Sequence, residues 1–306
     1  MTARGTAPRR VVVIHNPAAG RRRGRFLAEV LRGLEAAGLA VERRVTRGPG
    51  DAQAYAAGLR GRPLAAVVAA GGDGTVNEVC NGLAGDPLPL GLIPLGTANV
   101  LAAELGLPAD PRALARVIAG APPRPVWLAR ANGRLFAAVA GAGFDAWVVA
   151  GVNLALKRRL GKGAYALETL RRLVLPPPAD YRVTVDGRAH RAASVVVCNG
   201  RHYAGRYVLA PEADLARPEV HACLFTRPGR RHLARYILAT LAGRAPALAD
   251  VRILPGRRVE VSGPAGPVQA DGDVCTRLPL VVEGGAARLR VLAPAAHPAT
   301  ADSESV

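Results

Sequence analysis

Residues 67–79 read Val67-Val68-Ala69-Ala70-Gly71-Gly72-Asp73-Gly74-Thr75-Val76-Asn77-Glu78-Val79, which joins an apolar run to a glycine-rich turn and a helical pattern. The apolar run begins at Leu64 and is typical of a buried strand, whereas Val76, Val79 and Leu83 share one helix face. Glycines let the backbone approach an anion, and the first free N–H groups of a helix point toward it. The segment therefore predicts a phosphate-binding turn, although parallel α/β proteins also use glycine-rich turns for purely structural reasons.

Asp73 lies inside this turn, where a carboxylate is unexpected unless a magnesium ion separates it from the phosphate. We therefore take Asp73 as a candidate catalytic residue that organises nucleotide-bound Mg²⁺. On this interpretation its carboxylate is useful only through a cation, so Asp73→Ala should abolish turnover and leave the fold intact.

The same alternation of strand, loop and helix runs through the first 125 residues. We expect strands at 10–14, 41–46, 64–70 and 90–93, and helices near 21–37, 51–59, 76–83 and 111–119, with Asp51 as an N-cap. Loops 15–20 and 94–102 follow the first and fourth strands. Because open α/β sheets bind ligands at the carboxyl ends of their strands, these loops predict one shared nucleotide site. The arginines at 21–23 either neutralise phosphate or begin a solvated helix.

Beyond the proline-rich segment 121–125 the pattern changes to alternating strands. Asn132-Gly133 and Asp186-Gly187 predict hairpin turns. Further strands are expected at 181–186, 192–198, 219–225, 258–262, 278–282 and 287–292, and helices at 145–160, 164–175 and 230–241. We predict an α/β domain over 1–125, a β-rich domain over 126–293 and a disordered tail over 294–306.

Composition narrows the class of protein. Half of the 306 residues are hydrophobic and the formal net charge is +18. No signal-peptide core and no run of 18 apolar residues is found, so we expect a cytoplasmic protein without a transmembrane helix, its four scattered cysteines reduced. The positive charge suits nucleic acid, anionic membrane or nucleotide phosphates. With 4% aromatic residues and no nucleic-acid-binding motif, we expect no nucleic-acid partner.

Several motifs together resemble the diacylglycerol kinase catalytic-domain family, which includes sphingosine and ceramide kinases and bacterial lipid kinases. NAD kinases and 6-phosphofructokinases carry a related Gly-Gly-Asp-Gly turn, but NAD kinases lack the second glycine string. The resemblance implies a Rossmann-like α/β nucleotide-binding domain, followed by a mostly antiparallel β-sandwich domain with helical insertions. The motifs are Gly71-Gly72-Asp73-Gly74, Pro94-Leu95-Gly96-Thr97-Ala98-Asn99, Gly141-Ala142-Gly143-Phe144-Asp145-Ala146, Cys198-Asn199-Gly200, Leu209-Ala210-Pro211 and Gln269-Ala270-Asp271-Gly272-Asp273.

The resemblance also implies an ATP- and Mg²⁺-dependent kinase that phosphorylates a primary hydroxyl of a lipid, diacylglycerol or a sphingoid base. Asp273 is the implied general base, whereas Asp271 could shape the turn that carries it. Thr46 could equally be only a β-branched strand residue. The implied nucleotide-binding residues are Asn16, Thr46, Gly71, Gly72, Asp73, Gly74, Thr75, Asn77, Glu78, Gly96, Thr97 and Asn99.

Three departures from the family pattern matter. Asp273 stands where relatives carry Glu, and Val100 stands where many carry Asp. Ala216-Arg217-Pro218 replaces an acidic cluster that holds a structural Mg²⁺ in relatives, so we expect that site to be lost, with Asp214 and Glu219 as its remaining acids.

Rival functions are a kinase for NAD or a soluble metabolite, and a catalytically degenerate nucleotide-binding regulator. The expected partners are a lipid substrate at the membrane surface, an anionic membrane that binds the protein peripherally, and a second copy in a homodimer. The basic residues Lys157, Arg158, Arg159, Lys162, Arg171 and Arg172 crowd one predicted helix pair. They form either a membrane-facing surface or an ordinary solvated face.

Overall fold

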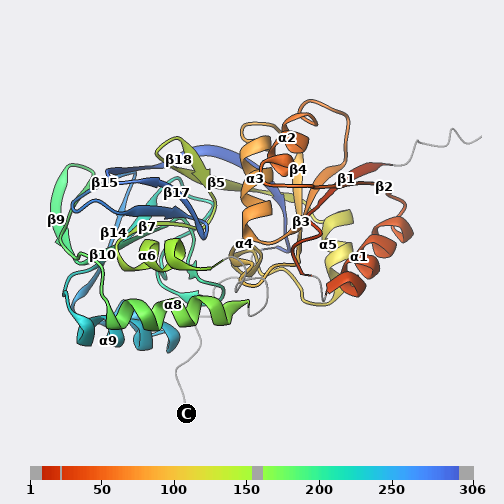
Figure 1. Cartoon of the computed structure of the whole chain (residues 1–306). Coiled ribbons are helices and arrows are strands. Elements are labelled where there is room, and N and C mark those ends of the chain that lie inside the picture. The colour runs from red at the N-terminus through yellow and green to blue at the C-terminus, as the bar shows by residue number, and fades with distance from the viewer. Residues whose placement is uncertain (1–8, 21–22, 154–160, 296–306) are drawn as a thin grey trace, which may run out of the picture.

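The computed structural model describes residues 9–20, 23–153 and 161–295 (Figure 1). Within these ranges the strands form a ten-stranded sheet, a six-stranded sheet and a small two-stranded sheet. Helices α1, α2, α3 and α5 surround one half of the molecule, whereas α8 and α9 lie side by side on the other half.

The N-terminal half is the predicted parallel α/β unit. Its strands are β1 (Arg10–His15), β2 (Ala40–Val45), β3 (Ala66–Gly71) and β4 (Pro89–Pro94), all parallel in the order β2-β1-β3-β4. Helices α1 (Gly24–Ala36) and α5 (Pro111–Gly120) pack on one face, and α2 (Asp51–Ala57), α3 (Asp73–Leu83) and α4 (Val100–Glu104) on the other. Every residue of β3 is buried, because helices cover both faces of the sheet.

The C-terminal half is an antiparallel sandwich, as expected. Its buried core lies between β5, β8, β15 and β18 of the larger sheet and β7, β10, β13 and β16 of the six-stranded sheet. The strands are β5 (Pro123–Ala131), β6 (Arg134–Phe136), β7 (Val139–Ala142), β8 (Tyr181–Val185), β9 (Arg188–Ala192), β10 (Ser194–Cys198), β11 (His202–Tyr203), β12 (Tyr207–Val208), β13 (Val220–Phe225), β14 (Val251–Gly256), β15 (Arg258–Ser262), β16 (Pro267–Ala270), β17 (Asp273–Arg277) and β18 (Leu280–Leu292). The helices are α6 (Phe144–Gly151), α8 (Lys162–Val174) and α9 (Arg230–Leu241), with a 3₁₀ turn at Ala245–Ala247.

Strand β18 corrects the expectation of two separate strands at 278–282 and 287–292. It is one strand of 13 residues, which pairs with β15 and β5 in the sandwich and with β4 in the parallel sheet. Its pairing with β5 shifts register between Glu283 and Ala287. Gly285, with φ of +65°, permits this irregularity without ending the strand. The larger sheet therefore continues through both halves, and the proposed boundary near residue 125 stays a prediction.

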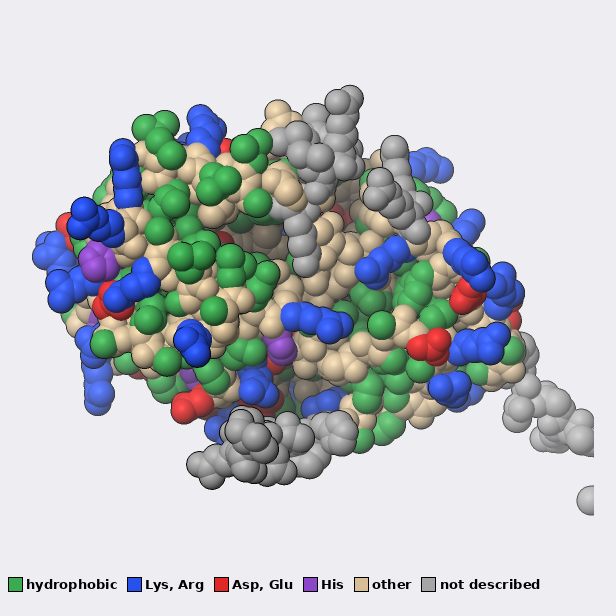
Figure 2. All heavy atoms as spheres, turned by 90° about the horizontal axis from the view of Figure 1, so that it is seen from below, with side chains coloured by type: hydrophobic (Ala, Val, Ile, Leu, Met, Phe, Trp, Pro, Cys, Tyr) green, Lys and Arg blue, Asp and Glu red, His purple; other side chains and the backbone are tan. Residues whose placement is uncertain are grey.

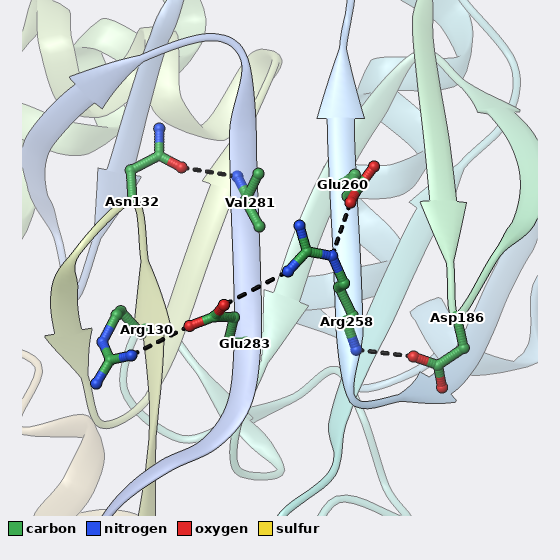
Figure 3. Close-up of polar contacts among 7 residues, drawn as sticks. All are labelled: Arg130, Asn132, Asp186, Arg258, Glu260, Val281 and Glu283. Atoms are coloured by element: carbon green, nitrogen blue, oxygen red, sulfur yellow. Dashed lines mark hydrogen bonds and ion pairs between the residues drawn. The ribbon is translucent and has the colours of Figure 1, made fainter.

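Both predicted hairpin turns are confirmed, and each also binds a neighbouring strand (Figure 3). Asn132 and Asp186 have φ of +44° and precede glycines with positive φ, as two-residue hairpin turns require. The Asn132 Oδ1 accepts the Val281 N–H at 2.7 Å, and the Asp186 carboxylate accepts the Arg258 N–H at 2.8 Å. These bonds join each turn to the next strand of the sheet.

A row of ion pairs crosses the exposed side of the same strands. Arg130 on β5 binds Glu283 on β18 at 3.1 Å, and Glu283 also binds Arg258 on β15 at 3.4 Å. Arg258 in turn binds Glu260 at 2.7 Å (Figure 3). All are exposed, so each contributes little to stability.

Two local expectations need correction. Asp51 is the first residue of α2 and not its N-cap. Its carboxylate accepts the N–H groups of Arg47 and Gly48 in the preceding turn, so it does not bond the free N–H groups of the helix. The residue before it, Gly50, takes the cap position with a left-handed φ of +88°. The helix expected at 145–160 ends at Gly151. Residues 152–153 are described and are not helical. Residues 154–160, with Lys157, Arg158 and Arg159, lie outside the described residues, as do the first two arginines of 21–23 and the predicted tail from 296 onward.

Candidate active site

The two glycine loops touch each other at the carboxyl ends of β3 and β4. A β-carbon on Gly96 would lie 2.5 Å from the Cα of Gly72, and one on Gly72 would lie 3.3 Å from the Cα of Gly96. No side chain fits between backbones this close. The loops can therefore meet only because both positions are glycine.

Asp73 joins the same two loops by hydrogen bonds. Its carboxylate accepts the backbone N–H of Asn99 at 2.9 Å and that of Val100 at 2.6 Å, which are the first N–H groups of α4. Burial raises the pKa of Asp73, although these two N–H groups oppose the rise. The expectation that this carboxylate is useful only through a cation is therefore wrong, because it also caps α4. Val100 contributes here through its backbone, which needs no acidic side chain.

Asn16 and Thr75 connect the β1 loop to the central turn. The Asn16 amide donates to the Thr75 hydroxyl at 3.0 Å and accepts the Ala18 N–H at 2.9 Å. A β-carbon on Gly71 would lie 2.5 Å from the Thr75 side chain, so Gly71 is needed for this close approach. Three predicted nucleotide-binding residues thus lie together at one edge of the sheet.

The other predicted nucleotide contacts are Thr97, Asn99, Thr46, Asn77 and Glu78, and not all of them lie at the loop surface. Thr97 is exposed at the second loop, and the Asn99 side chain bonds both backbone groups of Gly96, so these residues shape the loop surface. Thr46 is buried directly after β2, at 7% exposure. The side chains of Asn77 and Glu78 make contacts away from the loop surface.

Glu78 accepts the N–H groups of Gly50 and Ala52 at 2.9 and 3.1 Å, and so satisfies the N-terminus of α2. Asn77 is 1% exposed, and its amide donates to the Leu135 carbonyl and to the Asp271 carboxylate at 2.9 and 2.8 Å. Asn77 therefore joins α3 to the C-terminal half, a role that sequence reasoning did not anticipate.

The N-terminus of α3 is a candidate anion site. This helix of 11 residues begins at Asp73, and its N-cap residue, Gly72, has no side chain to bond the first N–H groups. Uncapped N–H groups at the positive end of a helix dipole attract phosphate oxygens.

Asp273 lies against this helix end although it belongs to the C-terminal half. Its Oδ2 is 3.2 Å from the position that a β-carbon on Gly74 would take, so any larger residue at 74 would contact the carboxylate. Asp273 is exposed, and no described residue makes a hydrogen bond or ion pair with its carboxylate. A carboxylate that is free of such partners and lies beside a candidate anion site is available to accept a proton.

Asp271, two residues earlier, has the opposite surroundings. Its carboxylate accepts the N–H groups of Ala137, Ala138 and Val139, besides the Asn77 amide, over distances of 2.8 to 3.1 Å. Its φ of +49° places it in the two-residue turn between β16 and β17. Burial raises the pKa of Asp271, and the donated hydrogen bonds oppose the rise. Asp271 therefore shapes the turn that presents Asp273.

A second set of polar side chains, which sequence reasoning missed, holds the other side of this turn. Gln269 is 1% exposed, accepts the Gly272 N–H at 3.0 Å and donates to the Asp145 carboxylate at 2.6 Å. The Tyr203 hydroxyl also donates to Asp145. Burial raises the pKa of Asp145, and these two donors oppose it. Gln269 and Asp145 lie in motifs visible in the sequence, but nothing local indicates that they meet.

The carboxylates near the glycine loops decide whether this site could hold magnesium. The described residues contain no group of three or more His, Cys, Asp or Glu side chains that could hold a metal ion, including the region of Asp214. Magnesium in kinase sites is held by one or two carboxylates together with substrate phosphates. A carboxylate offers about four acceptor positions, and two at Asp73 are used by Asn99 and Val100. Asp73 therefore fits as one ligand of an ion that the nucleotide brings with it.

Sequence and structure comparisons show which known proteins the chain resembles. Residues 10–131 match the family described as diacylglycerol kinase catalytic domain, and residues 138–293 match the YegS C-terminal NAD kinase beta sandwich-like domain. The chain is 33% identical over 264 residues to a diacylglycerol kinase of Bacillus subtilis, covering 83% of this chain and 86% of the relative. It is 31% identical to a diacylglycerol kinase of Mycobacterium tuberculosis, covering 80% and 82%. A crystal structure of a diacylglycerol kinase from Bacillus anthracis superimposes with a TM-score of 0.75 at 26% identity, covering 94% of this chain and 98% of that one.

Proposed function

This chain belongs to the diacylglycerol kinase family, and from that premise we propose that it transfers the γ-phosphoryl group of ATP to a primary hydroxyl of an amphiphilic lipid, diacylglycerol or a sphingoid base. The observation that carries the proposal is the meeting of an exposed carboxylate with an uncapped helix end. Asp273 comes from the C-terminal half and α3 from the N-terminal half, so the site forms only where the two halves meet.

In the proposed reaction the N–H groups at the start of α3 bind the phosphates of ATP. Asp273 accepts the proton of the lipid hydroxyl. The hydroxyl oxygen of the lipid then forms a bond to the γ-phosphorus, while the bond from the γ-phosphorus to the β-phosphate oxygen breaks and ADP leaves. Such transfers depend mainly on positioning and charge neutralisation. Magnesium, when bound, would neutralise charge on the β and γ oxygens, with Asp73 as its protein ligand.

The lipid substrate implies that the protein works at a membrane surface. No helix among the described residues is long and apolar enough to cross a membrane. The formal charge of +18 supports peripheral binding to an anionic bilayer, because each basic residue near such a surface contributes about 1 kcal/mol. Homodimer formation stays a prediction that mass measurement in solution would test.

An acceptor screen with γ-labelled ATP tests the proposal. Detergent-dispersed diacylglycerol and sphingosine would be compared with NAD and soluble alcohols. We expect label in the lipid fraction, and Asp273→Asn should slow its appearance about 10²- to 10⁴-fold. Label in NAD alone would assign the chain to a different kinase class. Nucleotide binding without transfer to any acceptor would identify a regulator.

A further inference from the structure

Helices α8 and α9 leave an unusual amount of apolar surface uncovered. Eight large apolar side chains are exposed among the described residues, and six belong to these helices or to the residue after α8. We call this surface the α8–α9 face. Its apolar members and their exposures are Leu167 (56%), Leu170 (61%), Val174 (62%), Leu175 (62%), Leu238 (66%) and Leu241 (53%). Contiguous exposed apolar residues mark a contact site more often than chance would give.

The helical period places these side chains on common stripes. Leu167, Leu170 and Val174 follow the spacing i, i+3, i+7 on α8, and Leu238 and Leu241 are three apart on α9. The two helices pack against each other. Figure 2 shows the side of the molecule on which α8 and α9 lie in Figure 1, with apolar side chains gathered there and Lys and Arg around them.

The charged residues within α8 and α9 are almost all positive. Glu168 is the one acid within α8, and it is buried at 6% exposure and paired with Arg171 and Arg172. Helix α9 contains no acid. Exposed arginines that form no ion pair with a described carboxylate border the face at Arg227, Arg230, Arg231 and Arg244.

The face also lies beside the proposed transfer site. Gly161, just before α8, would place a β-carbon 3.8 Å from the Thr97 hydroxyl of the second glycine loop. At 1.5 Å per residue, Leu167 lies only about 9 Å further along the helix axis. A surface that covers α8 therefore comes close to the nucleotide loops.

We propose that the α8–α9 face is the surface by which this protein docks on an anionic lipid bilayer, with its leucines inserted among the acyl chains and its arginines at the headgroups. The proposal rests on the proposed lipid kinase function and names the structural basis of its membrane contact. Amphipathic helices with apolar and basic sides bind membranes in this way, and arginine stems extend to reach the headgroups. A symmetric dimer through the same face would bring like charges of two copies together, which opposes association.

Binding to vesicles of phosphatidylcholine and phosphatidylglycerol, without ATP or acceptor, tests the surface directly. Each leucine moved from water into an apolar layer is worth roughly tenfold in affinity. Leu167→Ser, Leu170→Ser, Leu238→Ser and Leu241→Ser combined should therefore weaken binding at least about 100-fold. Activity on detergent-dispersed lipid and the unfolding temperature should stay close to wild type.

Two double variants with the same change in net charge separate the contribution of the α8–α9 face to vesicle binding from that of the overall charge. Arg230→Glu/Arg231→Glu should weaken vesicle binding about tenfold or more at low salt. Arg112→Glu/Arg116→Glu on α5 makes the same change in net charge away from the face, and should change binding less than about threefold because such charges are screened over distance.

The outcomes separate the surface from the kinase assignment. Unchanged vesicle binding by the leucine variant overturns the docking surface, even if lipid is phosphorylated. A wild-type dimer that becomes monomeric in that variant, with vesicle binding unaltered, would also overturn it and assign the face to a second copy. Vesicle binding lost in the variant, in a protein that phosphorylates no lipid, would leave the surface standing and the proposed function refuted.

Discussion

Asp271 and Asp273 lie two residues apart in one hairpin, and their hydrogen bonding separates their roles. Asp271 accepts four N–H groups, whereas Asp273 accepts none from the described residues. We expect Asp273→Asn to lower kcat about 10²- to 10⁴-fold, since general-base loss has effects of that size, while the dissociation constant for ATP stays nearly constant. Asp273→Glu should keep much of the activity. Steady-state kinetics and nucleotide titration check both.

The matched variant Asp271→Asn should act on stability instead. It removes charge from a site that four donors surround, and should cost about 2–4 kcal/mol of unfolding free energy. Normal lipid turnover by Asp273→Asn, together with an inactive but stable Asp271→Asn protein, would show that Asp271 is the base.

Asp73 should be both a structural and a catalytic residue. Asp73→Ala leaves the N–H groups of Asn99 and Val100 unpaired, so we expect about 2–4 kcal/mol of lost stability as well as at least roughly 10²-fold lower activity. This replaces the expectation of an intact fold drawn from the sequence alone. Chemical denaturation and activity at a temperature where the variant is folded separate the two effects. A stable variant with wild-type turnover would contradict both roles.

At the scale of single elements, α4 connects the nucleotide loop to the sandwich. It begins at the N–H groups bound by Asp73 and ends at Glu104, which binds the His202 ring and N–H at 2.6 and 2.9 Å. A β-carbon on Gly200 would lie 2.8 Å from the Glu104 carboxyl carbon, so the glycine of Cys198-Asn199-Gly200 makes room for this contact. A movement of the second glycine loop would therefore be transmitted through α4 to the C-terminal half.

The pKa of Glu104 makes this connection sensitive to acid. Burial disfavours its charge, but hydrogen bonds from the His202 ring and from the Arg201 and His202 N–H groups outweigh burial and hold the pKa below the usual 4.5. A lowered carboxyl pKa adds stability above the unfolded pKa, and that stability is lost as pH falls below about 4.5. Glu104→Gln should lose about 1–3 kcal/mol at pH 7 and flatten the acid limb of the stability curve. If wild type and Glu104→Gln lose stability equally steeply as the pH falls, Glu104 is not the source of the acid sensitivity.

At the scale of the whole molecule, the two halves share one core. The buried cluster beneath α2 and α3 includes residues that come after position 125: Val126, Leu128, Leu135, Ala137, Leu215, Leu289, Val291 and Ala293. The strand β18 also hydrogen-bonds β4 at the edge of the parallel sheet. We therefore expect the full chain to unfold in one transition, although the sequence predicts two domains.

A fragment of residues 1–125 tests this coupling. Without most of β5 and all of β18 it exposes apolar core residues and the edge of β4, and we expect aggregation or no cooperative unfolding. A chain of residues 1–295 retains both strands and should unfold like the full protein. Coincident tryptophan and circular dichroism transitions would support a single unit, since Trp127 and Trp147 both report on the C-terminal half. A soluble, cooperatively folding fragment would instead support the boundary near 125.

Much of the fold could be predicted because its signals are local. The apolar run before Gly71 indicates a buried strand whatever surrounds it, and Asn132-Gly133 makes its turn because those residues tolerate positive φ. Helix α9 runs from Arg230 to Leu241 as its periodicity predicts. The family also follows from sequence, since its motifs are short strings that need no third dimension to be recognised.

The roles of the site residues depended on contacts between distant parts of the chain. Asp73 bonds residues 26 and 27 positions away, and Asn77 bonds Asp271 across 194 positions. Gln269 reaches Asp145 across 124 positions. No local periodicity encodes such pairs, because the free energy of a hydrogen bond depends on burial and on partners that only folding brings together. The glycine loops were therefore visible in the sequence, whereas the placement of Asp273 over Gly74 and the exposure of the α8–α9 face were decided by tertiary packing.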